Sequence, residues 1–291
     1  MITVRLEYAP APVDNPLKGL VPYAGDRRGR IPHSMEFQYF PLSDLVKDYG
    51  VYDWQPLENF LDAVSQRGHQ AIFRVMLEYP GSPASFKLIP DFLLSDGLAV
   101  HRYPNSRLTE GAPMEMVTPN YEDERLRRVF KEFISALGAR YDGDPRIGFI
   151  TAGLLGYWGE WHTHPHIELF ASKDVQKEIM DAYEASFKKT PILLRYPAGE
   201  NQDRYAANAQ RCFGYHDDSF AWTTINTGKK QDRWSFMTRL TEAGEGALEK
   251  WKTHPIGGEI RPEAWGKVFD IDPGGDRIQD FLQCVAATHV T

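Results

Sequence analysis

One acidic residue, Glu160, stands between two tryptophans, Trp158 and Trp161, directly after a glycine-rich apolar run at 147–156. Such a run is typical of a buried strand, so the residues after it would lie at the exposed end of that strand. Tryptophan rings stack on the flat apolar faces of sugars, and a glycosidic oxygen needs a proton donor to leave. The segment favours a sugar-cleaving site, and the alternative is a glutamate that caps a strand beside core tryptophans.

A second glutamate, Glu259, ends the apolar segment 255–260. By our count of strands, Glu160 follows the fourth strand and Glu259 follows the seventh. In a β/α barrel the functional side chains lie at the C-terminal ends of the strands, where these two strands face each other. Two carboxylates about 5 Å apart can carry out a double displacement, with Glu160 as general acid/base and Glu259 as nucleophile. The alternative for Glu259 is a charge after a Gly-Gly turn.

The same rule selects further side chains at the predicted strand ends. We expect Tyr23, Trp158 and Trp161 to stack on sugar rings. We expect the other selected residues to bind the hydroxyls or carboxylates of the substrate: Arg74, Glu78, His162, Arg195, Asp217 and Asp218. Arg74 lies inside the third predicted strand, where an unpaired charge is costly. It could hold the nucleophile ionised, or it could form a purely structural ion pair with Glu78 or Glu36.

Three histidines, His162, His164 and His166, alternate along the segment after Glu160 and suggest a metal site. Zinc sites usually also show a carboxylate or cysteine ligand at a fixed offset, and Pro165 interrupts the segment. We therefore expect no metal or other cofactor, and we expect His162 to bind substrate or to orient Glu160. Two alternatives stay open, namely a metal-dependent hydrolase or lyase that uses the three histidines and a carbohydrate-binding barrel without catalysis.

The elements that must position these residues are short apolar strands alternating with amphipathic helices, which predicts parallel β-α units. We predict strands at 19–24, 35–40, 70–77, 147–155, 191–196, 212–215 and 255–260. We predict helices at 43–49, 56–67, 121–141, 172–189, 202–210, 233–251 and 276–287. This order predicts an α/β fold of the (β/α)8 TIM-barrel type, as one domain over 1–291 whose last strand is short or truncated. A doubly wound sheet is disfavoured because no glycine-rich phosphate loop follows the first strand.

One long segment, 79–119, separates the third strand from the next long helix and is rich in proline, glycine and serine. It is predicted to hold one short helix near 90–95. Long insertions in a barrel usually lie on the catalytic face, so we expect this insertion to shape the substrate cleft.

Composition limits the kinds of partner. The chain has 291 residues, a formal net charge of −7 and an aromatic content of 13%. The negative charge argues against nucleic acid as a partner, and no segment is long or apolar enough to span a membrane. The predicted partner is a carbohydrate substrate, and the oligomeric state is left undetermined. Cys212 and Cys284 are too few for a disulfide scaffold, so we expect two buried thiols.

Three motifs are shared with a known family: Asn15-Pro-Leu-Lys-Gly19, Gly153-Leu-Leu-Gly-Tyr-Trp-Gly-Glu-Trp-His162 and His216-Asp-Asp218. Through them the chain resembles a bacterial, mostly secreted family of barrel proteins known as domain of unknown function 4832. It implies a glycoside-hydrolase-like barrel with an oligosaccharide or polysaccharide substrate, secreted or periplasmic as a mature form. The N-terminus shows no targeting pattern, which leaves a cytoplasmic protein as the alternative. One difference is Gly159, which stands where the best-known barrel glycosidases have an asparagine.

Overall fold

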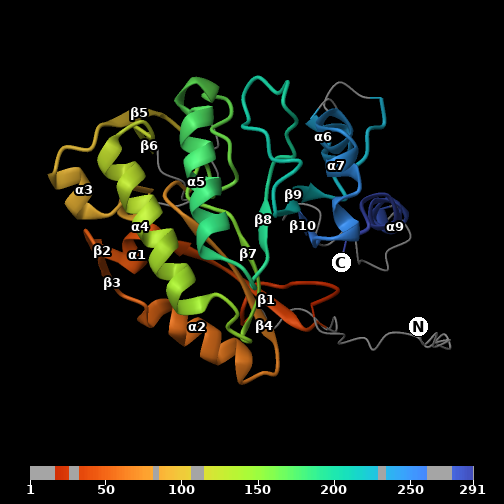
Figure 1. Cartoon of the computed structure of the whole chain (residues 1–291), viewed down its shortest axis with the longest axis horizontal. Coiled ribbons are helices and arrows are strands. Elements are labelled where there is room, and N and C mark those ends of the chain that lie inside the picture. The colour runs from red at the N-terminus through yellow and green to blue at the C-terminus, as the bar shows by residue number, and fades with distance from the viewer. Residues whose placement is uncertain are drawn as a thin grey trace.

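The structure is a computed structural model that describes residues 17–25, 33–80, 85–105, 115–228, 234–260 and 277–290. Its centre is a curled sheet of parallel strands whose order in space follows their order in the chain (Figure 1). These strands are β1 (Met35–Pro41), β4 (Gln70–Met76), β7 (Ile147–Thr151), β8 (Ile192–Leu194), β9 (Gly214–Phe220) and β10 (Ile256–Ile260). The parallel β/α order confirms the predicted α/β class, as a curled half-barrel.

The two ends of the predicted eight-stranded barrel differ from expectation. The segment predicted as the first strand runs parallel to β1 but makes only two isolated bridges, Leu20 with His33 and Tyr23 with Phe37. No eighth strand occurs within the described residues, which omit 261–276 and 291. The described part of the barrel is therefore a six-stranded sheet that this bridged segment extends at the β1 edge.

Three amphipathic helices pack on the convex face of this sheet: α2 (Gln55–Ser65), α4 (Glu124–Tyr141) and α5 (Lys173–Ser186) (Figure 1). Each buries its apolar stripe in the main core, as Leu126, Phe130 and Phe133 of α4 do. The Asp123 side chain caps α4 by accepting from the amide of Arg125, and Ser172 caps α5 by accepting from that of Val175. None of the described helices is both long and apolar enough to cross a membrane.

The shorter elements depart most from the sequence predictions. The predicted helix 43–49 is a single turn, α1 (Leu42–Leu45), followed by the antiparallel pair β2 (Val46–Asp48) and β3 (Val51–Tyr52). Residues 202–210 are all described and form turns in place of the predicted helix. The predicted helix 233–251 is divided into α6 (Phe236–Ala243), α7 (Glu245–Leu248) and η4 (Lys250–Lys252). Gly244, with φ of +93°, ends α6 because a left-handed residue cannot continue a helix.

Outside the sheet the structure contains two helices that were predicted and several elements that the sequence left unassigned. The insertion 79–119 holds η1 (Ser85–Leu88), α3 (Asp91–Ser95) and an antiparallel hairpin of β5 (Val100–Pro104) and β6 (Glu115–Pro119). Of these, α3 confirms the short helix predicted near 90–95. Two further helices are η2 (Ile167–Leu169), which was not predicted, and α9 (Arg277–Thr288), which confirms the helix predicted at 276–287. Both cysteines are free thiols, but Cys212 is exposed, so the expectation of two buried thiols is wrong at that position.

Side chains on the concave side of the sheet, which we call the lumen, form two layers. Successive side chains of a strand alternate between faces, so residues two apart lie in consecutive layers of the lumen. The lower layer is apolar and contains Phe37, Ile72, Phe149 and Leu193. Two residues further along the same strands are Tyr39, Arg74, Thr151 and Arg195. The lumen therefore changes from apolar to polar toward the C-terminal ends of the strands.

Candidate active site

The turn that carries Glu160 is held in an unusual backbone conformation. Between 153 and 162, the positive φ angles belong to Leu154 (71°), Gly156 (75°), Trp158 (52°), Gly159 (70°) and Trp161 (59°). Two amides tie this turn to the end of β4: that of Leu154 donates to the carbonyl of Val75 (2.8 Å) and that of Trp158 to the carbonyl of Glu78 (2.7 Å). Left-handed residues other than glycine cost about 1–3 kcal/mol each and concentrate at functional sites. The fold therefore maintains this turn against local backbone strain.

Replacing Gly156 by alanine is expected to destabilise the protein more than replacing Gly50, although both glycines have positive φ angles, 75° and 67°. A Cβ at 156 would lie 2.4 Å from the carbonyl oxygen of His162, whereas a Cβ at 50 would meet no atom within 4 Å. Gly50→Ala should cost about 1–2 kcal/mol for its left-handed backbone. Gly156→Ala should cost about 1–3 kcal/mol more for the clash. Urea unfolding of both variants measures the difference, and equal losses would contradict it.

Arg74 is the centre of the polar layer. Its side chain is buried, and its Nε donates to Thr151 Oγ1 at 3.2 Å. One terminal nitrogen donates to Asp218 Oδ1 at 2.8 Å, and the other lies 3.7 Å from Glu160 Oε1. Burial acts to lower the pKa of Arg74, but Asp218, Tyr39 and the nearby glutamates raise it above its ordinary value. The partner of this buried arginine is therefore Asp218 of β9, and the predicted partners Glu36 and Glu78 are wrong.

Asp218 is held by three basic side chains. Besides Arg74, its carboxylate lies 2.8 Å from the Nε of Arg195 and 2.5 Å from the Nδ1 of His216. Burial acts to raise the pKa of Asp218, but Arg74, His216 and Arg195 together hold it well below the ordinary value. Asp218 is thus an anion near neutral pH, with the guanidinium groups of two arginines beside it.

Glu259 is the second carboxylate in the lumen. Its Oε1 accepts a hydrogen bond from the hydroxyl of Tyr23 (3.1 Å), and its Oε2 accepts one from that of Tyr39 (3.0 Å). Burial raises the pKa of Glu259; Arg74 opposes this rise and the negative charge of Glu160 adds to it. The register between β9 and β10 shifts between Gly258 and Ile260, at the position of Glu259. Such irregularities re-aim side chains, which suits a functional residue.

Glu160 and Glu259 lie close together. One carboxylate oxygen from each of Glu160, Asp218 and Glu259 lies within 4.8 Å of the other two. On its other side, Glu160 Oε2 is 3.2 Å from the Nε2 of His162. The Nδ1 of His162 accepts from the amide of His164 at 3.2 Å, so the ring proton resides on Nε2 and is donated to Glu160. The predicted role of His162 in orienting Glu160 therefore has a geometric basis.

Three residues predicted to contact substrate lie away from the lumen. Trp161 is 2% exposed and donates its indole N–H to the carbonyl of Ala152 (2.8 Å), as part of the main core. Asp217 points to the opposite face of β9 from Asp218 and accepts from the hydroxyl of Thr224 (2.6 Å). Glu78 is fully buried and accepts from the hydroxyls of Thr118 and Tyr121. Of the aromatic side chains predicted to stack on sugar, Trp158 and Tyr23 remain partly exposed.

Sequence reasoning assigned no role to three lumen residues that complete the site. Tyr39 contacts Glu259, His216 contacts Asp218, and Thr151 accepts from Arg74. Their spacing along the predicted strands could have identified them. Tyr39 and Thr151 each stand two residues after an apolar lumen residue on the same strand, and His216 stands two residues before Asp218.

The histidines after Glu160 do not converge on one point. His162 contacts Glu160, His166 lies 3.5 Å from Glu168 through its Nδ1, and His164 is exposed. The geometry of these described side chains therefore gives no support to the alternative of a three-histidine metal site.

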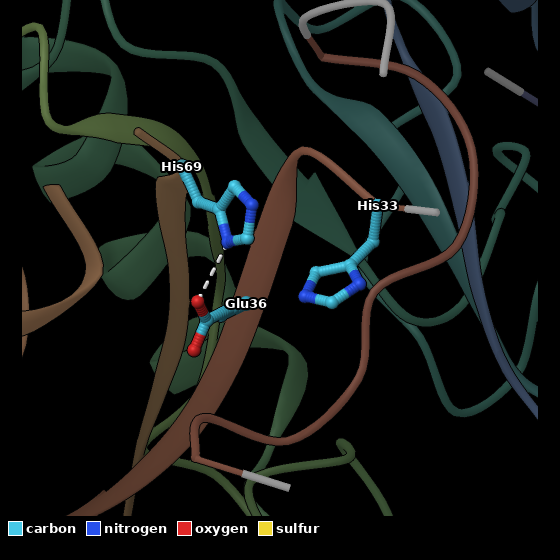
Figure 2. Close-up of side chains that lie close together, drawn as sticks. All are labelled: His33, Glu36 and His69. Carbon is cyan, nitrogen blue, oxygen red and sulfur yellow. Dashed lines mark hydrogen bonds and ion pairs between the residues drawn. The ribbon is translucent and has the colours of Figure 1, made fainter. Parts of the chain in front are cut away.

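A different cluster, His33, Glu36 and His69, lies at the start of β1 on the outer face of the sheet (Figure 2). Figure 2 shows His69 directed at Glu36, and their Nδ1 and Oε1 atoms are 2.7 Å apart. Both oxygens of Glu36 also accept from Arg67, at 2.7 and 2.6 Å. Because the guanidinium already neutralises this carboxylate, we interpret the cluster as an ion pair that anchors the end of α2 to β1.

Comparison with known proteins places the fold among glycosidases. No family model matches the chain and no curated protein does, so the resemblance to domain of unknown function 4832 remains a prediction. The structure is similar to endo-glycoceramidase II from Rhodococcus sp., with a TM-score of 0.53 and 13% identity over 88% of this chain and 64% of that chain. The chain thus spans less than two thirds of that enzyme.

The catalytic domain of β-amylase from Paenibacillus polymyxa is also similar, with a TM-score of 0.55 and 10% identity over 89% of this chain and 83% of that chain. At these identities the likeness concerns the fold alone. The chain therefore has the curled parallel β/α fold that is found in glycoside hydrolases of the TIM-barrel type.

Proposed function

We propose that this protein is a glycoside hydrolase that acts on an oligosaccharide or polysaccharide with Glu160 and Glu259 as its catalytic pair. The observation that carries the proposal is the separation of the two glutamates, whose carboxylate oxygens approach within 4.8 Å at the polar end of the lumen. A spacing of about 5–5.5 Å between carboxyl groups is that of retaining enzymes, and inverting enzymes need about 6.5–9.5 Å to admit a water. An approach of single oxygens within 4.8 Å is compatible with the shorter, retaining spacing, which the configuration of the product tests.

The proposed reaction has two steps. Glu259 attacks the anomeric carbon while Glu160 protonates the oxygen of the departing sugar, and the bond from the anomeric carbon to that oxygen breaks. Glu160 then takes a proton from water, whose oxygen displaces Glu259 and releases the sugar. The glycoceramidase from Rhodococcus has been captured as a lactosyl-enzyme intermediate, which is the kind of state that the first step would leave.

The surroundings of the two carboxyls support this division of roles. Both oxygens of Glu259 accept hydrogen bonds from tyrosine hydroxyls, and the positive charge of Arg74 opposes the rise in pKa that burial causes. Hydrogen bonds to a carboxylate and a nearby cation both favour the anion that a nucleophile requires. The side chain of Glu160 is 16% exposed and lies at the tip of the turn, where a departing group can reach it. Tyr23 contacts Glu259, and the ring centroid of Trp158 lies 6.3 Å from that of His162, which contacts Glu160.

A panel of aryl glycosides and polysaccharides tests the proposal. We expect turnover of at least one substrate by the intact protein, and its loss in Glu160→Gln. Proton NMR of the first product should show the anomer of the substrate, as retention requires. Release of the opposite anomer would overturn the retaining mechanism. Sugar binding without turnover, unchanged in Glu160→Gln, would instead identify a carbohydrate-binding protein and would sink the proposal of an enzyme.

A further inference from the structure

Glu78 is buried beneath the turn that carries Glu160, and its carboxyl ends two chains of hydrogen bonds. In the first chain, the amide of Gly156 donates to the hydroxyl of Tyr121 (2.7 Å), which donates to Glu78 Oε1. In the second chain, the hydroxyl of Thr118 donates to Glu78 Oε2 and itself lies 2.6 Å from the hydroxyl of Tyr103.

The direction of the second chain follows from counting protons. A hydroxyl has a single proton to donate. Burial raises the pKa of Glu78 to about 7, and above that pH its ionised carboxyl can only accept, so Thr118 gives its proton to Glu78 and Tyr103 must donate to Thr118. The hydroxyl of Tyr157, 2.6 Å from that of Tyr103, must then donate to Tyr103. Every donor in both chains thus points toward the carboxyl of Glu78, which serves as the shared acceptor.

These chains join two segments that lie far apart in the sequence. Tyr103 and Thr118 belong to the hairpin β5–β6 of the insertion, whereas Gly156 and Tyr157 belong to the turn that carries Glu160. The backbone of Glu78 adds a third link, because its carbonyl accepts from the amide of Trp158 at 2.7 Å. One residue at the end of β4 therefore holds the turn through both its side chain and its main chain.

We propose that Glu78 is a positioning residue, which fixes the turn bearing Glu160 and attaches the β5–β6 hairpin to it by accepting both hydrogen-bond chains. With 0% exposure, Glu78 cannot touch a substrate and acts only through its partners. The inference deepens the proposed function, because the turn that Glu78 holds is the one that presents the general acid. The strained backbone of that turn gives the anchor a physical purpose, since left-handed residues persist only where their surroundings enforce them.

The substitution Glu78→Gln tests this role because it keeps the shape of the side chain and changes one acceptor into a donor. In the variant, the NH₂ group of glutamine replaces one of the two oxygens that accept from the hydroxyls of Thr118 and Tyr121. The hydroxyl opposite this NH₂ group then has no acceptor for its proton, so its hydrogen-bond chain must break or reverse direction. Tyr121→Phe is a second, milder variant that removes only the link to Gly156. We expect both variants to accelerate hydrogen exchange at the amides of Gly156 and Trp158 by about tenfold or more, measured by NMR.

The same chain contains a matched control. Arg140 donates to the hydroxyl of Tyr141 (3.0 Å), which donates to Glu58 Oε1 (3.0 Å), so the same motif occurs between α4 and α2. Glu58→Gln and Tyr141→Phe should leave exchange at Gly156 and Trp158 within about twofold of the wild type. Unchanged exchange in Glu78→Gln and Tyr121→Phe, or equal acceleration by the control variants, would overturn the positioning role.

Steady-state kinetics distinguishes a positioning role from a general loss of stability, because the two affect kcat and KM differently. On a substrate that the wild type cleaves, Glu78→Gln should lower kcat by roughly 10²-fold and change KM little, because the misplaced group is the acid and not the sugar-binding surface. A rise in KM with unchanged kcat would contradict the inference. If hydrogen exchange changes as expected but the wild type cleaves no sugar, the positioning role of Glu78 is supported and the proposed glycosidase function is wrong.

Discussion

Replacing Glu160 by glutamine is expected to slow cleavage of natural glycosides by roughly 10²–10⁴-fold, the usual contribution of a general acid. The effect should depend on the leaving group. A dinitrophenolate departs without a proton, so formation of the glycosyl-enzyme from a dinitrophenyl glycoside should be nearly normal in Glu160→Gln. Burst kinetics with that substrate measures this step separately from hydrolysis of the intermediate.

Glu259→Gln should behave differently, because a nucleophile is needed whatever the leaving group. We expect both classes of substrate to lose activity equally, and we expect no burst. Glu58→Gln, which removes a carboxylate from the ion-pair cluster on α2, should leave both rates unchanged. If instead Glu259→Gln shows the dependence on leaving group, the two roles are exchanged. If neither substitution affects turnover, the catalytic pair is wrong.

Removing the charge of Arg74 is the second change for which we expect a large effect. Arg74→Met keeps an unbranched side chain but leaves Asp218 and the two glutamates without their central cation. Deleting one partner of a buried ion pair costs about 3–5 kcal/mol when the other charge is left unpaired, and because Asp218 keeps Arg195 and His216 we expect the lower end of this range. Arg146 is a suitable control because it also contacts several carboxylates but is 24% exposed. Arg146→Met should cost about 1 kcal/mol or less per contact.

The direction in which pH changes the effect of Arg74→Met on stability follows from the ionisation of Asp218. Its pKa in the folded protein lies below the ordinary value of 3.8, so its stabilising effect is complete above pH 3.8 and is lost as pH falls through the folded pKa. The stability difference between wild type and Arg74→Met should therefore narrow as pH falls, first as Glu259, whose pKa burial raises, is protonated and then as Asp218 is protonated. Urea unfolding at several pH values checks this. A difference that grows in acid would contradict it.

Arg74→Met should also shift the pH at which activity is lost on the acid side of the pH profile. Arg74 lowers the pKa of Glu259, which burial raises, so removing Arg74 leaves the nucleophile protonated up to a higher pH. Activity should then be lost at a higher pH than in the wild type as the solution is acidified. Arg146→Met should leave the pH at which activity is lost in acid unchanged.

The strands of this fold were predictable because buried parallel strands are continuous apolar runs. The run predicted at 70–77 forms β4, and the run predicted at 147–155 forms β7, which ends at Thr151. The predicted strand is four residues longer than β7 because the apolar residues continue from the strand into the following turn. Sequence could place Glu160 and Glu259 at strand ends by counting, since the order of the strands in space is their order in the chain.

The pairing of side chains could not be predicted in the same way. Glu36 seemed a partner for Arg74, but alternation along β1 places Tyr39 in the lumen and Glu36 on the outer face. Glu78 follows the end of β4, where the alternation no longer applies, and its side chain turns toward the insertion. The true partner, Asp218, comes from a strand 144 positions away, and only the curvature of the sheet brings it near.

The hydrogen bond between Tyr23 and Glu259 joins residues that are 236 positions apart in the chain. Contacts of such high sequence separation carry a large loop-closure entropy and form late in folding. Helices α2, α4 and α5 can pack on the middle strands before either end of the sheet is in place. The nucleophile would then gain its hydrogen-bond donors, Tyr23 and Tyr39, only when the two ends of the sheet meet. During refolding, the return of activity would thus lag behind the return of tryptophan fluorescence.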